Sequence, residues 1–394
     1  MASLPTAPSL RPELRSSVVM RLALAYALAT NGLVLTPFLV AAVMLRFQLD
    51  ESVATQIAGV EILGVALSCA VMPRWISRAS ERFTRYALLG TVAGQAFSAL
   101  ATSTATLGIA RGFTGLCEGI LFVIVAASVS QRVLAERLWG KINLLAGAIN
   151  GSVLVLIAYL PQEWLGRWLF VLLVVVAALS APAIHGIGRF TAQAAQQRPR
   201  GKIPVRLVLA IWAVTVLIYG AQASQWAVSG IVGNQARLSP SMIGILLSVS
   251  SLMGFAGAII PSHRASHHHR LAIIWLAQLA LIGSILCFFR ASDGWSYFLS
   301  QLALNCSFFA IIPFMSGLLS EVDPDGSLVA RTVVVTFIGA GIGTAVAGAL
   351  FDQFGGVNFS YGLGLSIAAA LPFVWWSLRG NASVDKHATG QLPH

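Results

Sequence analysis

Charged residues are scarce in this sequence. Only 10% of its 394 residues are Asp, Glu, Lys or Arg, and 57% are apolar, whereas roughly a quarter of the residues in a typical soluble domain are charged. So few charges cannot cover the surface of a soluble protein of this size, which excludes an ordinary cytosolic enzyme, a disordered chain and a nucleic-acid-binding module. The composition therefore predicts a polytopic membrane protein.

Cysteine is rare, and acidic residues are fewer than basic ones. The four cysteines lie in apolar runs without CxxC spacing, so we interpret them as packing residues rather than disulfide or metal-site residues: Cys69, Cys117, Cys287 and Cys306. The 14 acidic residues leave a formal net charge of +11. We assign this excess to loop residues that orient helices in a lipid bilayer, and we expect no nucleic-acid partner.

Motifs for enzymatic or nucleotide chemistry are absent from the sequence. It contains no H-E-x-x-H, G-x-S-x-G or G-x-x-x-x-G-K-[ST] pattern, so we expect neither an enzyme with catalytic residues nor an ATP-driven pump, and no cofactor. A channel is disfavoured because no apolar run carries a filter-like signature. The run His267-His268-His269 predicts no metal site, since three adjacent side chains cannot face one ion on a regular helix.

Twelve apolar runs are long enough to cross about 30 Å of hydrocarbon. Backbone groups in lipid must form hydrogen bonds within their own segment, so these runs are predicted to be helices. The fold class is therefore an all-α polytopic membrane protein with twelve transmembrane helices. The predicted spans are 20–46, 52–73, 83–103, 105–131, 138–160, 165–188, 204–233, 240–262, 270–290, 294–320, 328–351 and 357–379.

Basic residues set the expected orientation. With the N-terminus inside, 20 of the 25 Lys and Arg residues fall in inner segments, and such a bias places basic loops in the cytoplasm. We therefore expect both termini to be cytoplasmic. The first apolar run is too long for the core of a cleaved signal peptide. The composition is compatible with a bacterial inner (plasma) membrane, and nothing in the sequence calls for more than a monomer.

The chain divides into two related halves. We predict six-helix bundles over 1–190 and 204–394, joined by a polar cytoplasmic linker over 191–203. Leu49-Asp50-Glu51-Ser52 opens the second span as Leu238-Ser239-Pro240-Ser241 opens the eighth, and Pro73 and Pro261 lie near their other ends. Matching features at offsets of 188 and 189 residues indicate an internal duplication. Two parallel six-helix halves are a known plan among transporters.

The sequence resembles the major facilitator superfamily in this organisation and in one local motif. The fourth span contains Arg111-Gly112-Phe113-Thr114-Gly115, which is similar to the start of the family pattern R-x-x-Q-G-x-G-A. Arg78 and Arg82 remain from the family's basic loop after the second span, whereas the fifth span lacks the proline and glycine pair of the antiporter pattern. The resemblance implies a secondary transporter whose spans 1, 4, 7 and 10 line a cavity. It also implies that Arg111 takes part in proton coupling.

Three ionisable residues fall inside predicted spans, namely Glu61, Arg111 and Glu118. Each costs roughly 2.5–3.5 kcal/mol to insert, so such residues mark pathways or relays. Arg111 and Glu118 are seven residues apart on one helix, a rise of about 10 Å, so Glu61 or a substrate anion is the better partner for Arg111. Our hypothesis is that Glu118 or Glu61 carries a proton and Arg111 modulates it. A static ion pair that holds two helices together is the alternative.

Polar and aromatic residues on four spans are the candidate substrate-binding residues. Amide and aromatic side chains suit a small amphipathic organic solute, including an organic or aromatic acid if Arg111 meets an anionic group. The amides could instead only hold helices together. Import and export stay open, as do proton-antiport efflux of drugs or metabolites and uncoupled facilitation. The candidates are Tyr26, Asn31, Arg111, Gln222, Gln225, Trp226, Ser229, Gln301, Asn305 and Phe308.

Overall fold

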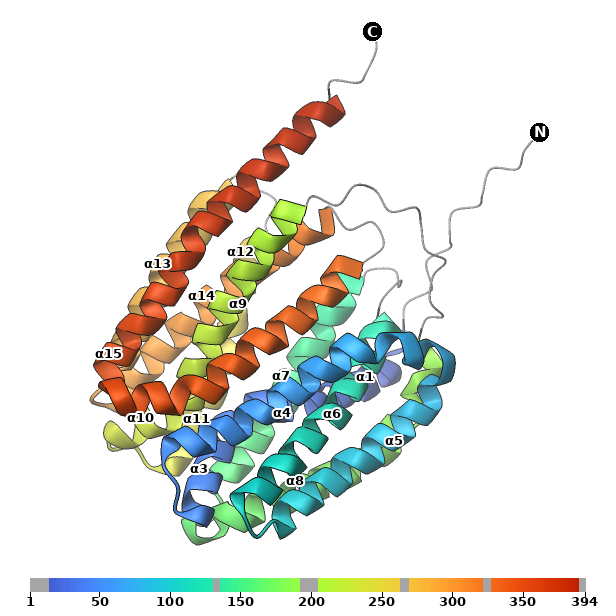
Figure 1. Ribbon diagram of the computed structural model, residues 1–394, viewed down its shortest axis with the longest axis vertical. Coiled ribbons are helices and arrows are strands. Elements are labelled where there is room, and N and C mark those ends of the chain that lie inside the picture. Colours follow the sequence, from blue (N-terminus) through green and yellow to red (C-terminus); the bar gives the residue numbers. More distant parts are fainter. Residues whose placement is uncertain (1–13, 130–134, 192–204, 263–268, 322–326, 390–394) are drawn as a thin grey trace, which may run out of the picture.

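The computed structural model describes residues 14–129, 135–191, 205–262, 269–321 and 327–389 (Figure 1). Within these ranges the chain is helical and contains no strand. Each of the twelve predicted spans has a helical counterpart, so the all-α polytopic fold class is confirmed. Most of the predicted linker, together with His267 and His268, lies outside the described residues.

The first half begins with a broken span. Pro37 has no N–H, so the Leu33 carbonyl loses its helical partner, and the Thr36 hydroxyl donates to it at 2.9 Å. The second span begins at Asp50, which caps the helix because its carboxylate accepts from the Val53 N–H at 3.0 Å. The helices are α1 (Ser16–Ala29), α2 (Asn31–Val34), α3 (Thr36–Phe47), α4 (Glu51–Val71), α5 (Pro73–Leu100), α6 (Thr104–Val129), α7 (Ala135–Ala158), α8 (Gln162–Ile184) and the short η1 (Ile187–Phe190).

The second half repeats this plan. The predicted seventh span is interrupted at Val228, and the last two spans form one element with a kink at Gly355, whose φ of 71° is left-handed. Such a backbone favours glycine because it has no Cβ. The helices are α9 (Val205–Ala227), α10 (Ser229–Gln235), α11 (Pro240–Gly254), η2 (Phe255–Ala258), α12 (Ile259–Ser262), α13 (Arg270–Phe288), α14 (Gly294–Glu321) and α15 (Ser327–Thr389).

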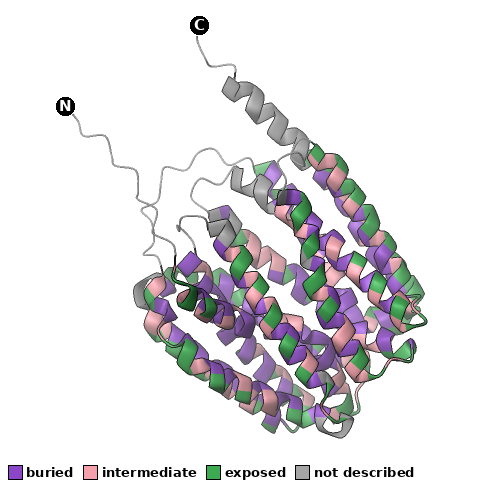
Figure 2. Ribbon diagram, turned by 180° about the vertical axis from the view of Figure 1, so that it is seen from behind, coloured by how far each residue is buried: buried purple, intermediate pink, exposed green. Residues whose placement is uncertain are grey.

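The outward surface of the bundle is apolar. Nine helices of the described chain are long and apolar enough to cross a membrane. Large apolar side chains stay exposed on them, for example Leu179 at 77% and Ile109 at 75%. Figure 2 shows buried positions gathered inside the bundle and exposed positions along its outer helices. Exposed apolar area of this extent fits lipid rather than water, and the protein is an integral membrane protein.

Apolar cores divide along the chain as the predicted halves do. One core cluster consists of residues between Leu207 and Val374, and another consists of residues between Leu35 and Leu173. A third cluster belongs mainly to the first half and takes in Phe337 and Ala340 of the second. This division supports the bundles 1–190 and 204–394, which remain a prediction.

The two halves pack closely where α4 lies beside the first arm of α15 (Figure 1). The Gly348 N–H donates to the Thr55 hydroxyl at 3.0 Å. A Cβ at Gly348 would overlap the backbone oxygen of Glu51, so this position requires glycine. Small residues let helices approach to this distance, and the contact lies near the predicted outer end of α4.

We expect Gly348→Ala to destabilise the protein because the added methyl group meets backbone that cannot yield. Overpacking of this kind costs about 1–3 kcal/mol, which should lower the melting temperature of the purified protein. Gly362→Ala on the same helix is the matched control, since no described atom lies within 4 Å of an added Cβ there. The control should be neutral or slightly stabilising. Equal melting temperatures for the two variants would contradict this account of the packing.

Candidate functional site

A buried ion pair lies inside the first half. The Arg111 Nε on α6 donates to a Glu61 oxygen on α4 at 3.0 Å, and the Arg111 Nη2 donates to the other oxygen. Arg111 is 2% exposed and Glu61 is fully buried. Of the two partners that the sequence suggested for Arg111, the structure gives Glu61. In this conformation the arginine is sealed, so it does not face an open solute pathway.

Two further contacts complete the surroundings of the guanidinium group. The Arg111 Nη1 donates to the Gln95 amide oxygen on α5 at 2.7 Å. The guanidinium carbon lies 5.5 Å from the centre of the Phe170 ring on α8, within cation–π range. All three guanidinium nitrogens therefore have partners. Arg111 on α6 and its partners on α4, α5 and α8 bring four helices together at one positive charge.

Glu118 lies next to this group and is fully buried. It lies within hydrogen-bonding range of Glu61 and Gln95, although neither of its oxygens forms a hydrogen bond of good geometry with the described residues. One arginine therefore stands beside two carboxyl groups. A second buried carboxylate here would have no counter-charge of its own, which is unfavourable by several kcal/mol.

The ion pair touches the break in the first span. A Cβ at Gly32 in α2 would overlap the Glu61 carboxyl group, so only glycine leaves room for the pair. Two residues further on, the Val34 carbonyl accepts a hydrogen bond from the Trp226 indole N–H on α9 at 3.0 Å. That carbonyl is free because the Phe38 N–H bonds to Leu35 instead. A short path of contacts thus links Glu61 to the second half.

Amide side chains of the second half form one connected group. The Gln225 amide donates to Gln301 at 2.8 Å, and the amides of Gln222 and Gln301 each approach the Asn305 oxygen at 3.3 Å. The structure brings these four predicted residues of α9 and α14 together. Ser229 is separate, because it begins α10 beyond the break and its hydroxyl donates to the Trp226 carbonyl at 2.7 Å.

Aromatic rings face one another between the halves. In the first half Tyr26 packs 5.4 Å from Phe122 and 5.5 Å from Trp139 between ring centroids, and Phe122 contacts Phe337 of the second half at 5.1 Å. Tyr219 lies near enough to Tyr26 for the two hydroxyl groups to interact electrostatically.

Tyr219 also brings the predicted Phe308 into this region. Their ring centroids are 4.9 Å apart, on the same two helices that carry the amides. Asn31, the other predicted residue of the first span, is buried at the start of α2. Apart from Ser229, each predicted substrate residue therefore belongs to one of four places. These are the break in the first span, the group of four amides, the aromatic rings and the ion pair.

Sequence reasoning missed several residues of the site. Gln95 and Tyr219 could have been found from the sequence. Gln95 is the only amide residue of the predicted third span, and Tyr219 precedes Gln222 by three residues, which is helical spacing. Asn150 of the predicted fifth span, whose amide donates to the Thr30 hydroxyl at 3.2 Å, also belongs to the residues that were missed. The role of Gly32 could not be found, because its constraint comes from a side chain 29 residues away.

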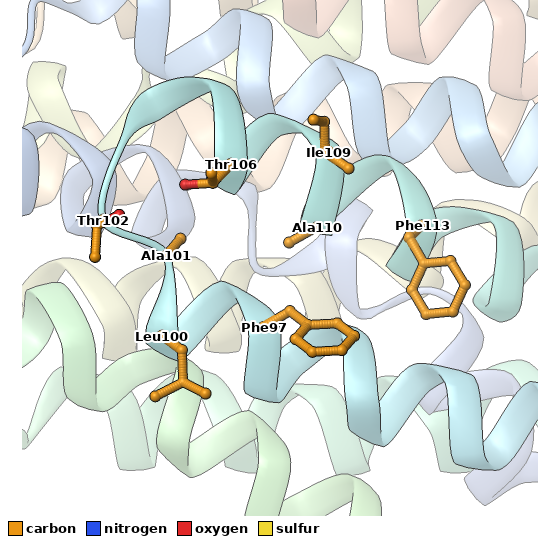
Figure 3. Close-up of a pocket in the computed structure, with 8 residues that line it drawn as sticks. All are labelled: Phe97, Leu100, Ala101, Thr102, Thr106, Ile109, Ala110 and Phe113. Atoms are coloured by element: carbon orange, nitrogen blue, oxygen red, sulfur yellow. The ribbon is translucent and has the colours of Figure 1, made fainter.

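A cavity of about 450 Å³ lies elsewhere, between the predicted outer ends of α5 and α6. Figure 3 shows its lining, which includes Phe97, Leu100, Thr106, Ile109 and Phe113. Leu100 is 61% exposed and Ile109 is 75% exposed. This cavity faces the lipid side of the bundle and includes no residue predicted to bind solute. The described part of the chain also holds no cluster of three or more possible metal ligands.

Solved structures provide the comparison, since neither a family model nor a curated protein matches the sequence. The structure is similar to that of the nucleoside transporter NupG, with a TM-score of 0.70 over 92% of this chain and 99% of that one at 11% identity. A D-xylose-proton symporter gives 0.70 over 91% and 97% at 14% identity. The human organic anion transporter MFSD10 gives 0.64 over 91% and 99% at 14% identity.

These likenesses span nearly the whole of each chain. At such low identity they establish the fold and not the substrate. The chain has the fold of the major facilitator superfamily, and the resemblance read from the sequence is confirmed at that level.

We expect Gly32→Ala to displace Glu61 from Arg111, because the added methyl group and the carboxyl group claim the same space. Disrupting a buried pair costs roughly 3 kcal/mol, measured as a lower melting temperature. In a Glu61→Ala background the same change should cost little, since the obstacle is gone. Gly108→Ala is the control, because no described atom lies within 4 Å of its added Cβ. Additive effects of Gly32→Ala and Glu61→Ala would exclude the contact.

Two acidic residues from different halves meet on the predicted outer side. Asp352 lies between the predicted spans 328–351 and 357–379, and Glu51 begins α4. Burial, together with the neighbouring Glu51 and Asp50, raises the pKa of Asp352 to about 6. Because the closed contact holds a proton more tightly than the separated residues do, acid stabilises the contact, and its stability is lost as the pH rises through about 6.

We therefore expect acidification to favour closure of the outer side. Spin labels would be attached to cysteines introduced at positions 56 and 353 of an otherwise cysteine-free protein. Electron paramagnetic resonance would then report the distance between α4 and α15. The short-distance population should grow as the pH falls from about one unit above the pKa of Asp352 to about one unit below it. Asp352→Asn should remove this dependence, and a distance distribution that does not vary with pH in the parent protein would refute the idea.

Proposed function

We propose that the protein is a secondary active transporter that moves a small amphipathic organic solute by alternating access, coupled to protons. The observation that carries the proposal is the buried group of Arg111, Glu61 and Glu118, in contact with the broken first span. Intramembrane ionisable residues are costly and mark relays. We place the protein in a bacterial inner membrane with both termini cytoplasmic, working as a monomer; the basic-residue bias supports the orientation.

The solved neighbours support transport as the general activity. Those proteins are a nucleoside transporter, a D-xylose-proton symporter and an organic anion transporter. Because these solutes differ so widely, the fold alone does not select one of them. The candidate solute site of this chain is the region between the halves that carries Tyr26, Tyr219, Gln222, Asn305 and Phe308.

Coupling would arise from competition for one arginine. While Arg111 pairs with Glu61, its charge is largely compensated, and Glu118 keeps its proton. If rocking of the halves moves the break at Gly32, the Glu61 carboxyl group moves with it. Arg111 is then released toward Glu118 along its own helix, and a nearby guanidinium favours loss of that proton. The Trp226–Val34 hydrogen bond joins this movement to the second half.

The observations favour Glu118 as the proton carrier and Glu61 as the residue that holds Arg111. The sequence left this choice open. Glu61 already satisfies the guanidinium charge, whereas Glu118 forms no ion pair and no hydrogen bond of good geometry among the described residues. A static ion pair explains Glu61 and Arg111, but it gives no reason to bury a third ionisable group beside them. Uncoupled facilitation remains the alternative and is tested below.

We expect Glu118→Gln to abolish pH-driven accumulation while preserving solute exchange. A solute that raises the melting temperature of the purified protein would be identified first and then assayed in proteoliposomes with an imposed pH gradient. Glutamine keeps the shape of the neutral acid, so binding and counterflow should persist while net coupling is lost. Glu61→Gln should weaken both, because it leaves Arg111 without its counter-charge.

Glu81→Gln is the control for these transport assays. Glu81 forms an exposed ion pair with Arg189 at 3.0 Å, so its replacement should leave coupling intact. Retention of pH-driven accumulation by both Glu118→Gln and Glu61→Gln would overturn the proton-coupling proposal.

A further inference from the structure

The amide group of the second half has open hydrogen-bonding capacity. Gln225 and Gln301 are fully buried and Asn305 is 5% exposed. After their mutual bonds, three buried atoms have no partner among the described residues: the side-chain oxygens of Gln222 and Gln225 and the side-chain nitrogen of Asn305. An unsatisfied buried polar atom costs about 1–3 kcal/mol. Three of them in one connected group indicate a place where another molecule completes the bonding.

The open atoms define what would complete them. Two carbonyl oxygens accept hydrogen bonds, and one amide NH₂ group donates them. A complementary solute therefore offers two donors and at least one acceptor close together. Helix-to-helix bonding alone does not account for these atoms, because the bonds that join α9 to α14 are already made by Gln225 with Gln301 and by Gln222 with Asn305.

No formal charge is available at this place. The amide group consists of neutral side chains. The nearby aromatic residues Tyr219 and Phe308 add none. Arg111, the cation that could have met an anionic solute, has all three guanidinium nitrogens occupied by Glu61 and Gln95. A charged solute at the amides would therefore bring an uncompensated charge out of water, which is far more costly than burying a neutral polar group.

Ring surfaces lie one helical turn from the amides. Tyr219 precedes Gln222 by three residues on α9, and Phe308 follows Asn305 by three residues on α14; residues at this spacing share a helix face. The two rings contact each other edge to face, with centroids 4.9 Å apart. Tyr26 of the first half lies across from Tyr219. A flat ring on the solute has aromatic surface to pack against at the same place as its hydrogen bonds.

We infer that this site takes an uncharged solute in which a flat ring carries a neutral group with two hydrogen-bond donors and an acceptor. The inference rests on the proposed function and narrows it, since organic acids and lipophilic cations are then disfavoured as solutes. The four amide residues act together as the polar part of the site, and Tyr219 with Phe308 forms its apolar part.

Three molecules of nearly equal shape isolate the effect of charge: benzamide is neutral, benzoate is an anion and benzamidine is a cation at neutral pH. Nicotinamide and nicotinate form a second neutral and anionic pair. Melting temperature and tryptophan-fluorescence titration of the full-length protein would measure their binding. We expect the neutral member of each set to bind at least about tenfold more tightly than its charged relatives. Stronger binding of benzoate or benzamidine, or no binding of either amide, overturns the inference.

Two variants assign that preference to the amide group. Gln222→Leu removes an open acceptor and should weaken benzamide binding by about tenfold. Gln222→Glu places a negative charge there and should shift the preference toward benzamidine. Gln222 is only partly buried, so both variants should fold, and Gln56→Leu at an exposed position of α4 is the control. Unchanged preference in both variants overturns the assignment.

The outcome is separable from that of the proposed function. A protein that accumulates an anionic solute in response to a pH gradient would retain the proposed transport and lose the inference. A protein that binds the amides but shows no solute movement would retain the site and lose the transport proposal.

Discussion

The pairing of Arg111 with Glu61 is the constraint on which the site depends. A guanidinium group at this depth is tolerated only because a carboxylate, an amide and an aromatic ring surround it. Those partners come from α4, α5 and α8, so one charge specifies how four helices of the first half pack. It also requires a glycine at position 32, since the carboxyl group occupies the space of a side chain there.

This constraint separates two tasks between the halves. The first half holds the ionisable residues in a sealed interior, and the second half presents neutral amides and rings. The broken first span lies between them, touching Glu61 on one side and bonded to Trp226 on the other. Under the proposed function, a change in protonation in the first half would reach the proposed solute-binding residues of the second half through this short set of contacts.

The fold was predictable from the sequence because each apolar run is long enough to cross the membrane. Backbone groups in lipid must form hydrogen bonds within their own segment, which allows only helices for such runs. The cap at Asp50 and the helix start at Pro240 were predictable for the same local reason. The choice between partners for Arg111 was not, since it depends on how α4 lies against α6. Ser229 was misplaced for a related reason: helical spacing assumes an unbroken helix, and the break at Val228 separates Ser229 from Gln225.

The hydrogen bond between Trp226 and Val34, which joins the two halves, is weak. Trp226 donates to the Val34 carbonyl, which has lost its helical partner at the break, and this bond between uncharged groups contributes only about 1 kcal/mol to stability. Thermal energy at room temperature is of comparable size, so this hydrogen bond by itself does not fix the two halves relative to each other. A buried ion pair at that position would hold the two halves together more strongly. The hydrogen bond from the indole to a backbone carbonyl is easier to break, which suits a protein whose halves move.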